Sequence, residues 1–116
     1  MWDEKLTITE AQGAQEGERI LQLKGPITST TSSALRDTMR ADKTAKTVIL
    51  DFSQVPYVDS AGVGVIVNAH VSCVNSGRRL VLVAVHDRIR ALMKTTRVDS
   101  VLMILPTLQK ARSAMQ

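Results

Sequence analysis

The sequence predicts a single α/β domain over residues 1–116, in which a mixed β-sheet of about five strands carries about four helices, packed largely on one face. Two observations lead to this fold class. Two short alternating runs at the start of the chain predict a β-hairpin. The rest of the chain alternates between apolar runs of strand length and segments of helical periodicity, which predicts later strands joined by helical crossovers.

The hairpin is predicted from residues 6–9 and 19–24, which alternate apolar and polar side chains on either side of a polar segment with two glycines. Pro26 ends the second strand because it has no N–H to donate to a neighbouring strand. The hydroxyl-rich residues 30–33 offer N-caps for a short helix over residues 34–41. The first third of the chain is therefore interpreted as strand, strand and helix.

The middle of the chain contains the longest predicted helix, over residues 59–76. It follows residues 47–52, an apolar run typical of a buried central strand, and a loop over residues 53–57. Gly77 suits the left-handed conformation that ends many helices. Apolar residues recur on one face of this helix, and we expect that face to be buried; it consists of Val63, Ile66, Val67, His70, Val71 and Val74.

The last third repeats the strand-and-helix pattern. Residues 80–85 are interpreted as another buried strand, and Asp87 is expected to cap the helix that follows. Residues 101–105 form a last short strand, and Thr107 can cap a closing helix. The predicted order is β-β-α-β-α-β-α-β-α.

The composition indicates a cytoplasmic globular protein. Apolar residues make up 44% of the chain and are mostly aliphatic; the aromatic residues are Trp2, Phe52 and Tyr57. No apolar run reaches the roughly 20 residues needed to span a bilayer, and the start of the chain lacks the pattern of a secretory signal. Cys73 is the single cysteine, which excludes a disulfide framework and a thiolate metal cluster.

The formal charge of +4 is unevenly distributed. Residues 1–58 contain 7 Lys and Arg against 8 Asp and Glu, whereas residues 59–116 contain 8 against 3. Such asymmetry suits an acidic protein partner or a nucleic acid, but the chain has few aromatics for base stacking and no recognisable DNA-reading motif. We therefore expect the basic side chains to lie on solvated helix faces and turns, namely Arg78, Arg79, Arg88, Arg90, Lys94 and Arg97.

One segment combines a buried strand, a short loop and Asp59-Ser60-Ala61-Gly62-Val63-Gly64 at the start of the longest helix. A helix start presents free backbone N–H groups and the positive end of the helix dipole, so it suits an anion, including a phosphate attached to the protein. The plain alternative is that Asp59 or Ser60 is an N-cap and the glycines permit close packing. Spacing alone favours that alternative.

Enzymatic interpretations of this segment fail on particular residues. Val67 occupies the position of the third glycine in a dinucleotide fingerprint, and the chain has no Walker loop. A serine hydrolase with Ser60 as nucleophile would need a glycine at position 58, which is occupied by Val58. His70 lies about 15 Å along the helix axis from Ser60, which is too far for a base, so we expect a packed histidine with one local partner. Nothing local supports His86 as a base, and we expect no enzyme.

The stretch Val48–Ile66 resembles the central signature of STAS domains, the sulfate transporter and anti-sigma factor antagonist family. That signature consists of an aliphatic strand ending in Asp, here Asp51, a loop with an aromatic residue, and Asp-Ser-Ser/Ala-Gly before an apolar helix. The remaining elements agree in order and length, so the resemblance covers roughly residues 5–115.

This resemblance implies an anti-sigma factor antagonist with Ser60 as its phosphoacceptor. The unphosphorylated protein would bind an anti-sigma factor that is also a serine kinase and so free a sigma factor; phosphorylation would end that complex and a serine phosphatase would reset it. ATP and magnesium would belong to the kinase, and this chain would need no cofactor or metal, bind no nucleic acid and insert in no membrane. The implied loop and partner interface consist of Thr28, Asp51, Asp59, Ala61, Gly62, Val63 and Gly64.

The sequence departs from the family pattern at two positions. Thr28 stands where the family usually has an acidic residue near the phosphoacceptor, which puts the efficiency of phosphorylation and the identity of the kinase in question. Ala61 replaces a second serine and leaves Ser60 as the single acceptor there. The resemblance further implies that Asp59 orients the loop and that Asp51 contributes to the same polar end of the sheet. The alternative function is a STAS subunit that never switches partners and docks on a transport ATPase or other regulatory complex.

Overall fold

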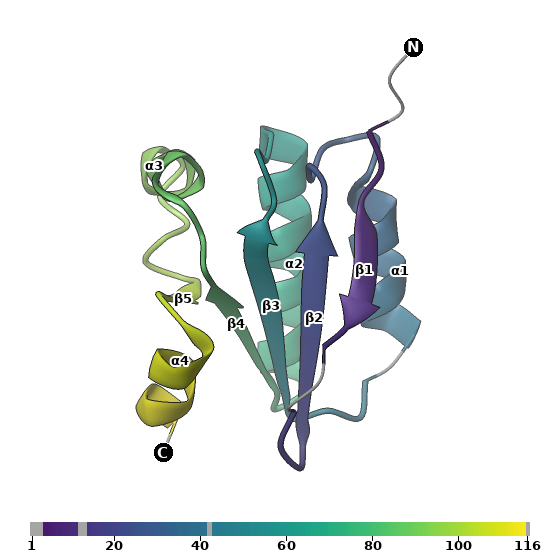
Figure 1. The fold of residues 1–116 in the computed structure, drawn as a ribbon, viewed down its shortest axis with the longest axis vertical. Helices are drawn as coiled ribbons and strands as arrows, with labels where there is room; N and C mark the ends of the chain where they lie inside the picture. Colours follow the sequence, from purple (N-terminus) through teal and green to yellow (C-terminus); the bar gives the residue numbers. More distant parts are fainter. Residues whose placement is uncertain (1–3, 12–13, 42, 116) are drawn as a thin grey trace.

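The computed structural model describes residues 4–11, 14–41 and 43–115, which form a mixed five-stranded sheet and four helices (Figure 1). The strands lie in sequence order across the sheet, with β1 at one edge and β5 at the other. In chain order the elements are β1 (Thr7–Glu10), β2 (Glu18–Lys24), α1 (Ser32–Ala41), β3 (Thr47–Gln54), α2 (Ser60–Asn75), β4 (Arg79–Val83), α3 (Asp87–Thr95), β5 (Met103–Leu105) and α4 (Leu108–Met115). The predicted order of elements is confirmed.

The predicted hairpin and mixed sheet are also confirmed. β1 pairs antiparallel with β2, whereas β2, β3, β4 and β5 pair in parallel, because each of the later connections contains a helix or a long crossover. The register between β2 and β3 shifts between Gln22 and Lys24. This irregularity lies at the end of β2, immediately before the chain turns away towards α1, and such bulges bend a strand at its end.

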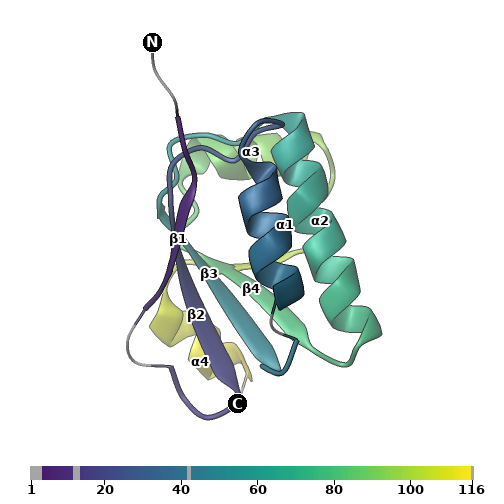
Figure 2. The ribbon, with the colours of Figure 1, turned by 90° about the vertical axis from the view of Figure 1, so that its right-hand side faces the viewer.

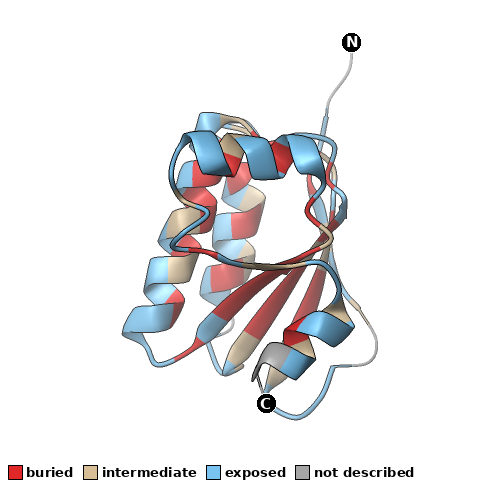
Figure 3. Ribbon diagram, turned by 90° about the vertical axis from the view of Figure 1, so that its left-hand side faces the viewer, coloured by how far each residue is buried: buried red, intermediate tan, exposed pale blue. Residues whose placement is uncertain are grey.

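The sheet is covered on both faces, more heavily on one. Figure 2 shows α1 and α2 side by side on one face, and they share a core with residues of α3; its largest fully buried side chains include Leu35, Phe52, Ile66 and Met93. α4 covers part of the other face, where Ala111 packs against Ile20, Ile49, Val81 and Val83. In Figure 3 the central strands are buried along most of their length between these two layers.

The predicted buried face of α2 is partly wrong. Val71 and Val74 are 45% and 55% exposed. The buried residues of this helix are Gly62, Val63, Val65, Ile66, Ala69 and Cys73. Three of these are small, and small side chains let a helix approach its neighbours closely, so the core face is turned away from the valines at 71 and 74.

Several predicted details of the helix ends can be compared with the structure. Gly77 has a positive φ of 73°, as expected for a left-handed residue after α2. The Thr107 side chain accepts a hydrogen bond from the Lys110 N–H at 3.1 Å, as predicted for a cap of α4. The prediction that Asp87 caps α3 is wrong. Asp87 is the first residue of the helix, and His86 occupies the N-cap position without a side-chain hydrogen bond.

Two polar residues differ from their predicted environments. Arg78 is 8% exposed, whereas the other five basic residues grouped with it in the sequence are exposed. It lies between α2 and β4, and its Nε donates to the Ala45 carbonyl at 2.6 Å, so its side chain packs against the segment before β3 instead of extending into solvent. The expected local partner of His70 is also wrong, because its Nδ1 is buried without a hydrogen-bond partner.

Candidate functional site

The start of α2 is held against the loop that connects β2 to α1. Ile27 forms an isolated parallel bridge with Val58. The Ile27 N–H donates to the Tyr57 carbonyl at 3.1 Å, and the Asp59 N–H donates to the Ile27 carbonyl at 3.1 Å. These backbone bonds fasten two loops that are far apart in sequence, and they fix where α2 begins.

Asp59 links the two loops through its side chain as well. It is the N-cap of α2, and its Oδ1 accepts from the Gly62 N–H at 2.8 Å. Its Oδ2 accepts from the Ser29 N–H at 3.2 Å. A carboxylate at this position satisfies a free N–H of the first turn and interacts favourably with the helix dipole. The predicted capping role of Asp59 is therefore accompanied by a second contact that orders the neighbouring loop.

Gly62 is required by close packing. A Cβ atom at this position would lie 2.1 Å from the Ile27 carbonyl oxygen and 2.8 Å from Val58 Cγ1. Gly64 differs, since a Cβ there would meet nothing within 4 Å. Gly62 thus allows the helix to contact the β2–α1 loop, and Gly64 leaves the helix backbone accessible on the surface.

Ser60 is the first residue of α2 and is exposed, with Ala61 and Gly64 exposed beside it on the first turns. Gly62 and Val63 face inward. We find no partner for the Ser60 hydroxyl among the described residues. The arrangement therefore presents one free hydroxyl at a helix N-terminus, with the small residues Ala61 and Gly64 exposed beside it.

Thr28 is half-buried and its hydrogen bonds are local. Its N–H donates to Thr31 Oγ1 at 2.9 Å, its Oγ1 accepts from the Thr30 N–H at 3.2 Å, and the Thr31 hydroxyl donates to the Pro26 carbonyl at 2.7 Å. The Thr28 carbonyl accepts from the Ser32 N–H at 2.8 Å, which begins α1. These bonds shape the loop that Asp59 contacts through Ser29.

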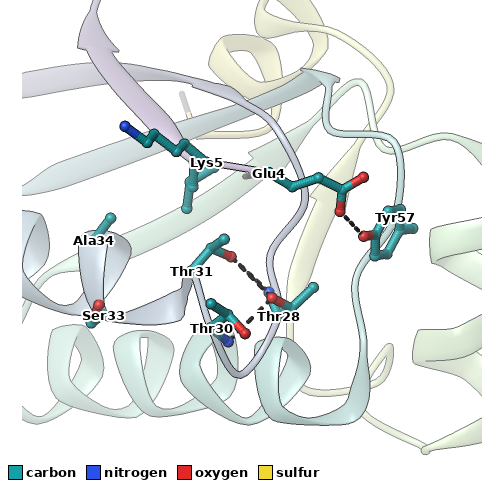
Figure 4. A pocket seen from close by; sticks show the side chains of 9 residues that line it. Glu4, Lys5, Thr28, Thr30, Thr31, Ser33, Ala34 and Tyr57 are labelled. Carbon is teal, nitrogen blue, oxygen red and sulfur yellow. Dashed lines mark hydrogen bonds between the residues drawn. The ribbon is translucent and has the colours of Figure 1, made fainter. Parts of the chain in front are cut away.

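A cavity of about 630 Å³ opens beside this loop (Figure 4). Thr28, Thr30 and Thr31 line one side of it, and Glu4 and Tyr57 meet at another, where the Tyr57 hydroxyl donates to the Glu4 carboxylate. That hydrogen bond, with a smaller contribution from desolvation, raises the pKa of Tyr57 above its ordinary value. The cavity lies between the β2–α1 loop, the segment just before β1 and Tyr57 of the loop that precedes α2.

Asp51 lies apart from the other predicted site residues. Its Oδ1 accepts from the Ser53 N–H at 2.9 Å. Side chains alternate along a strand, so Asp51 shares the face of Ile49, which packs towards α4, and not the face covered by α2. The structure brings together the loop of Thr28 and the helix start from Asp59 to Gly64, and it places Asp51 on the other side of the sheet.

Sequence reasoning missed Ile27 and Ser29 as parts of this site. Both act through backbone atoms, which carry no residue-type signal, and both contact residues about 30 positions later in the chain. Within residues 4–11, 14–41 and 43–115 there is no group of three His, Cys, Asp or Glu side chains that could hold a metal ion. In the same part of the chain, no helix has the length and apolar character needed to cross a membrane.

Comparison with known proteins identifies the family. The model of the STAS domain family matches residues 7–111. This chain belongs to the STAS family. An anti-sigma factor antagonist from Mycobacterium paratuberculosis has a similar structure, with a TM-score of 0.79, 22% identity, and coverage of 93% of each chain.

Two further solved structures are similar over most of this chain. A sulfate transporter family protein from Wolinella succinogenes has a TM-score of 0.77 and 23% identity, covering 86% of this chain and 85% of that one. The Bacillus cell fate determinant SpoIIAA, in its phosphorylated form, has a TM-score of 0.69 and 15% identity, covering 95% of this chain and 100% of that one. At these identities the likeness establishes the shared fold.

Proposed function

We propose that this STAS domain is an anti-sigma factor antagonist that changes partners when Ser60 is phosphorylated. The observation that carries the proposal is the exposed Ser60 hydroxyl at the start of α2, on a turn whose position is fixed by Asp59. The similar structures include an anti-sigma factor antagonist and the phosphorylated form of SpoIIAA, which supports the same function for this chain.

In the unphosphorylated state, the surface around Ser60 favours close approach of a partner. Ala61 and Gly64 are exposed and contribute almost no side chain, so a second protein can contact the helix backbone there. In this proposal the partner is an anti-sigma factor that is also a serine kinase, and its engagement frees a sigma factor in the cytoplasm. ATP and magnesium belong to that kinase, because phosphoryl transfer requires only an accessible, in-line hydroxyl from the substrate protein.

Phosphorylation of Ser60 would add about −1.5 to −2 charges. The free N–H groups and dipole of the helix start tolerate that charge, so the domain stays folded. At a packed interface the same charge must lose its hydration, which weakens the complex. A serine phosphatase that removes the phosphate restores binding, and the domain itself is a regulator without catalysis of its own.

The neighbouring Asp59 carboxylate adds a second consequence. A phosphate on Ser60 lies next to this carboxylate, and like charges repel. Because Asp59 holds the β2–α1 loop through the Ser29 N–H, repulsion loosens that bond and shifts the loop. The modification would therefore alter both the charge and the shape of the proposed partner surface, including the loop that contains Thr28.

The direct test uses the serine kinase encoded by the same organism, with labelled ATP. Wild-type protein and the Ser29→Ala variant should take up label, since Ser29 contributes its backbone N–H and not its hydroxyl to the site. Ser60→Ala should take up none. Label on Ser60→Ala at the wild-type level would show that the acceptor lies elsewhere.

A second candidate is a STAS subunit that docks on a transport ATPase or other regulatory complex without switching. The similarity to a sulfate transporter family protein favours it. Such a subunit would dock through the same first turns of α2, where Ala61 and Gly64 are exposed, and would not require the Ser60 hydroxyl. Affinity capture from the source organism separates the two: an anti-sigma kinase among the captured proteins supports the first, and a transport ATPase supports the second.

A further inference from the structure

A groove of about 160 Å³ lies between α1 and α2, away from the turn that carries Ser60. Figure 2 shows the two helices side by side along this face of the molecule. Its apolar lining comes from Met39, Val65, Ala69 and Cys73. Four basic side chains also line it, namely Arg36, Arg40, Lys43 and Arg78, and no Asp or Glu among the described residues does.

Arg78 is the most constrained of these four cations. It is 8% exposed, and its Nε donates to the Ala45 carbonyl at 2.6 Å. One terminal nitrogen, Nη2, is buried without an acceptor. A buried guanidinium without a carboxylate partner is costly, and three further positive charges at the same groove add repulsion.

The other three cations also lack an acidic partner within the described part of the chain. The ion pairs found there join Arg19 to Glu10 and Arg112 to Glu18, on other parts of the surface. Exposed cations normally interact with solvent alone, but here three of them line a groove that the buried Arg78 also lines. An anion in the groove would offset both the repulsion and the missing hydrogen-bond acceptor.

The size and polar lining of the groove indicate what kind of anion fits. Asn68 and Ser72 lie on its rim and are exposed, so an amide and a hydroxyl are available as additional donors. A water molecule occupies about 30 Å³ of liquid, so the groove has room for one tetrahedral oxyanion and a few waters, but not for a large ligand. Arginine forks match the oxygens of phosphate in pairs.

We propose that the α1–α2 groove binds a phosphate group, either as inorganic phosphate or as the end of a small phosphate monoester. The site is separate from Ser60, because Val65 and Cys73 lie about 7 to 20 Å further along the α2 axis. Phosphate binding here would cross-link α1 to α2 and would stabilise the domain through ligand linkage.

The test is a titration of the ¹⁵N-labelled protein with inorganic phosphate and with glycerol phosphate at constant ionic strength, followed by amide and arginine Nε–H chemical shifts. Saturable shifts should map to α1 and to residues 65–78. The Arg36→Gln/Arg40→Gln variant should weaken binding about tenfold, because two of the cations that attract the anion are removed. Neither residue is buried, so the fold should be retained.

Two matched variants serve as controls. Arg88→Gln/Arg90→Gln removes the same charge from exposed positions on α3 and should bind phosphate as the wild type does. Ser60→Ala should also bind normally, which keeps this site distinct from the proposed phosphoacceptor. Equal weakening in both arginine variants, shifts that centre on the start of α2, or an equal response to chloride would each overturn the proposal.

Discussion

The Asp59 carboxylate and the Ser29 backbone nitrogen are 3.2 Å apart, although the two residues are separated by 30 positions in the chain. The other oxygen of the same carboxylate accepts from the Gly62 N–H. One side chain thus begins α2 and holds the loop before α1. The exposed position of Ser60 depends on this arrangement, since Ser60 follows Asp59 directly.

Asp59→Ala should destabilise the domain by about 1–2 kcal/mol, because the N-cap bond and the loop contact are both lost. Asp59→Asn keeps an oxygen for one of these bonds and should cost less. Urea unfolding measures the free energy of unfolding in each case. Asp87→Ala is the matched control, as Asp87 is exposed in the first turn of α3 and does not provide its N-cap. An equal loss in Asp59→Ala and Asp87→Ala would contradict the assigned role of Asp59.

Gly62→Ala and Gly64→Ala should have opposite effects on stability. At Gly62 the added methyl would collide with the Ile27 carbonyl, so the helix must move away from the loop, at a cost of about 1–3 kcal/mol or more. At Gly64 the methyl enters open space, and alanine should stabilise the helix by about 0.4–1 kcal/mol. Thermal unfolding of the two variants gives the comparison. A stable Gly62→Ala variant would argue against the close contact with Ile27.

Acid should weaken the attachment of α4 to the sheet. Burial alone would raise the pKa of Glu18, but hydrogen bonds from the Gln15 N–H and Arg112, with the charge of Arg112, outweigh it and hold the pKa below its ordinary value of 4.5. Arg112 Nη2 lies 3.1 Å from Glu18 Oε1. Because the pKa of Glu18 is lower in the folded state, its pair with Arg112 stabilises the protein at pH values above the ordinary pKa of a glutamate. This contribution is lost as the pH falls through the lower pKa that Glu18 has in the folded protein.

Unfolding of the wild type and of Glu18→Gln at several pH values tests this prediction. The quantity to compare is the difference between their free energies of unfolding. That difference should be at most about 1 kcal/mol near neutral pH and should shrink as the pH falls below the ordinary pKa of 4.5. Glu16→Gln, at an exposed neighbouring position, should show no such trend. A difference that is constant with pH would mean that the ionised form of Glu18 makes no contribution.

Much of the fold follows from local pattern. The apolar run at residues 47–52 and the alternating run at 19–24 became β3 and β2, because strand length and period are local properties. The Asp59 cap was likewise among the predicted alternatives for the helix start. The periodicity of α2 was recognised, but its buried face was misplaced, since valines at 71 and 74 carry a stronger apolar signal than the small residues that pack.

The remaining features depend on tertiary contacts that no local window contains. Arg78 was expected in solvent, and its burial follows from the path of the chain between α2 and β4. The contact between Ser29 and Asp59 joins two loops through a backbone atom, which leaves no mark in the residue types. Asp51 ends the apolar run as the family signature requires, yet strand alternation turns its side chain to the α4 side of the sheet.

The most direct test of the switch is the affinity of the anti-sigma factor kinase for this domain before and after phosphorylation of Ser60, measured by calorimetry. Circular dichroism verifies that the phosphorylated domain is folded. We predict a folded phosphoprotein whose dissociation constant is at least about thirtyfold higher, because a charge buried at an interface without a partner costs 2 kcal/mol or more. An unchanged dissociation constant for the folded, fully phosphorylated protein would contradict the proposed switch.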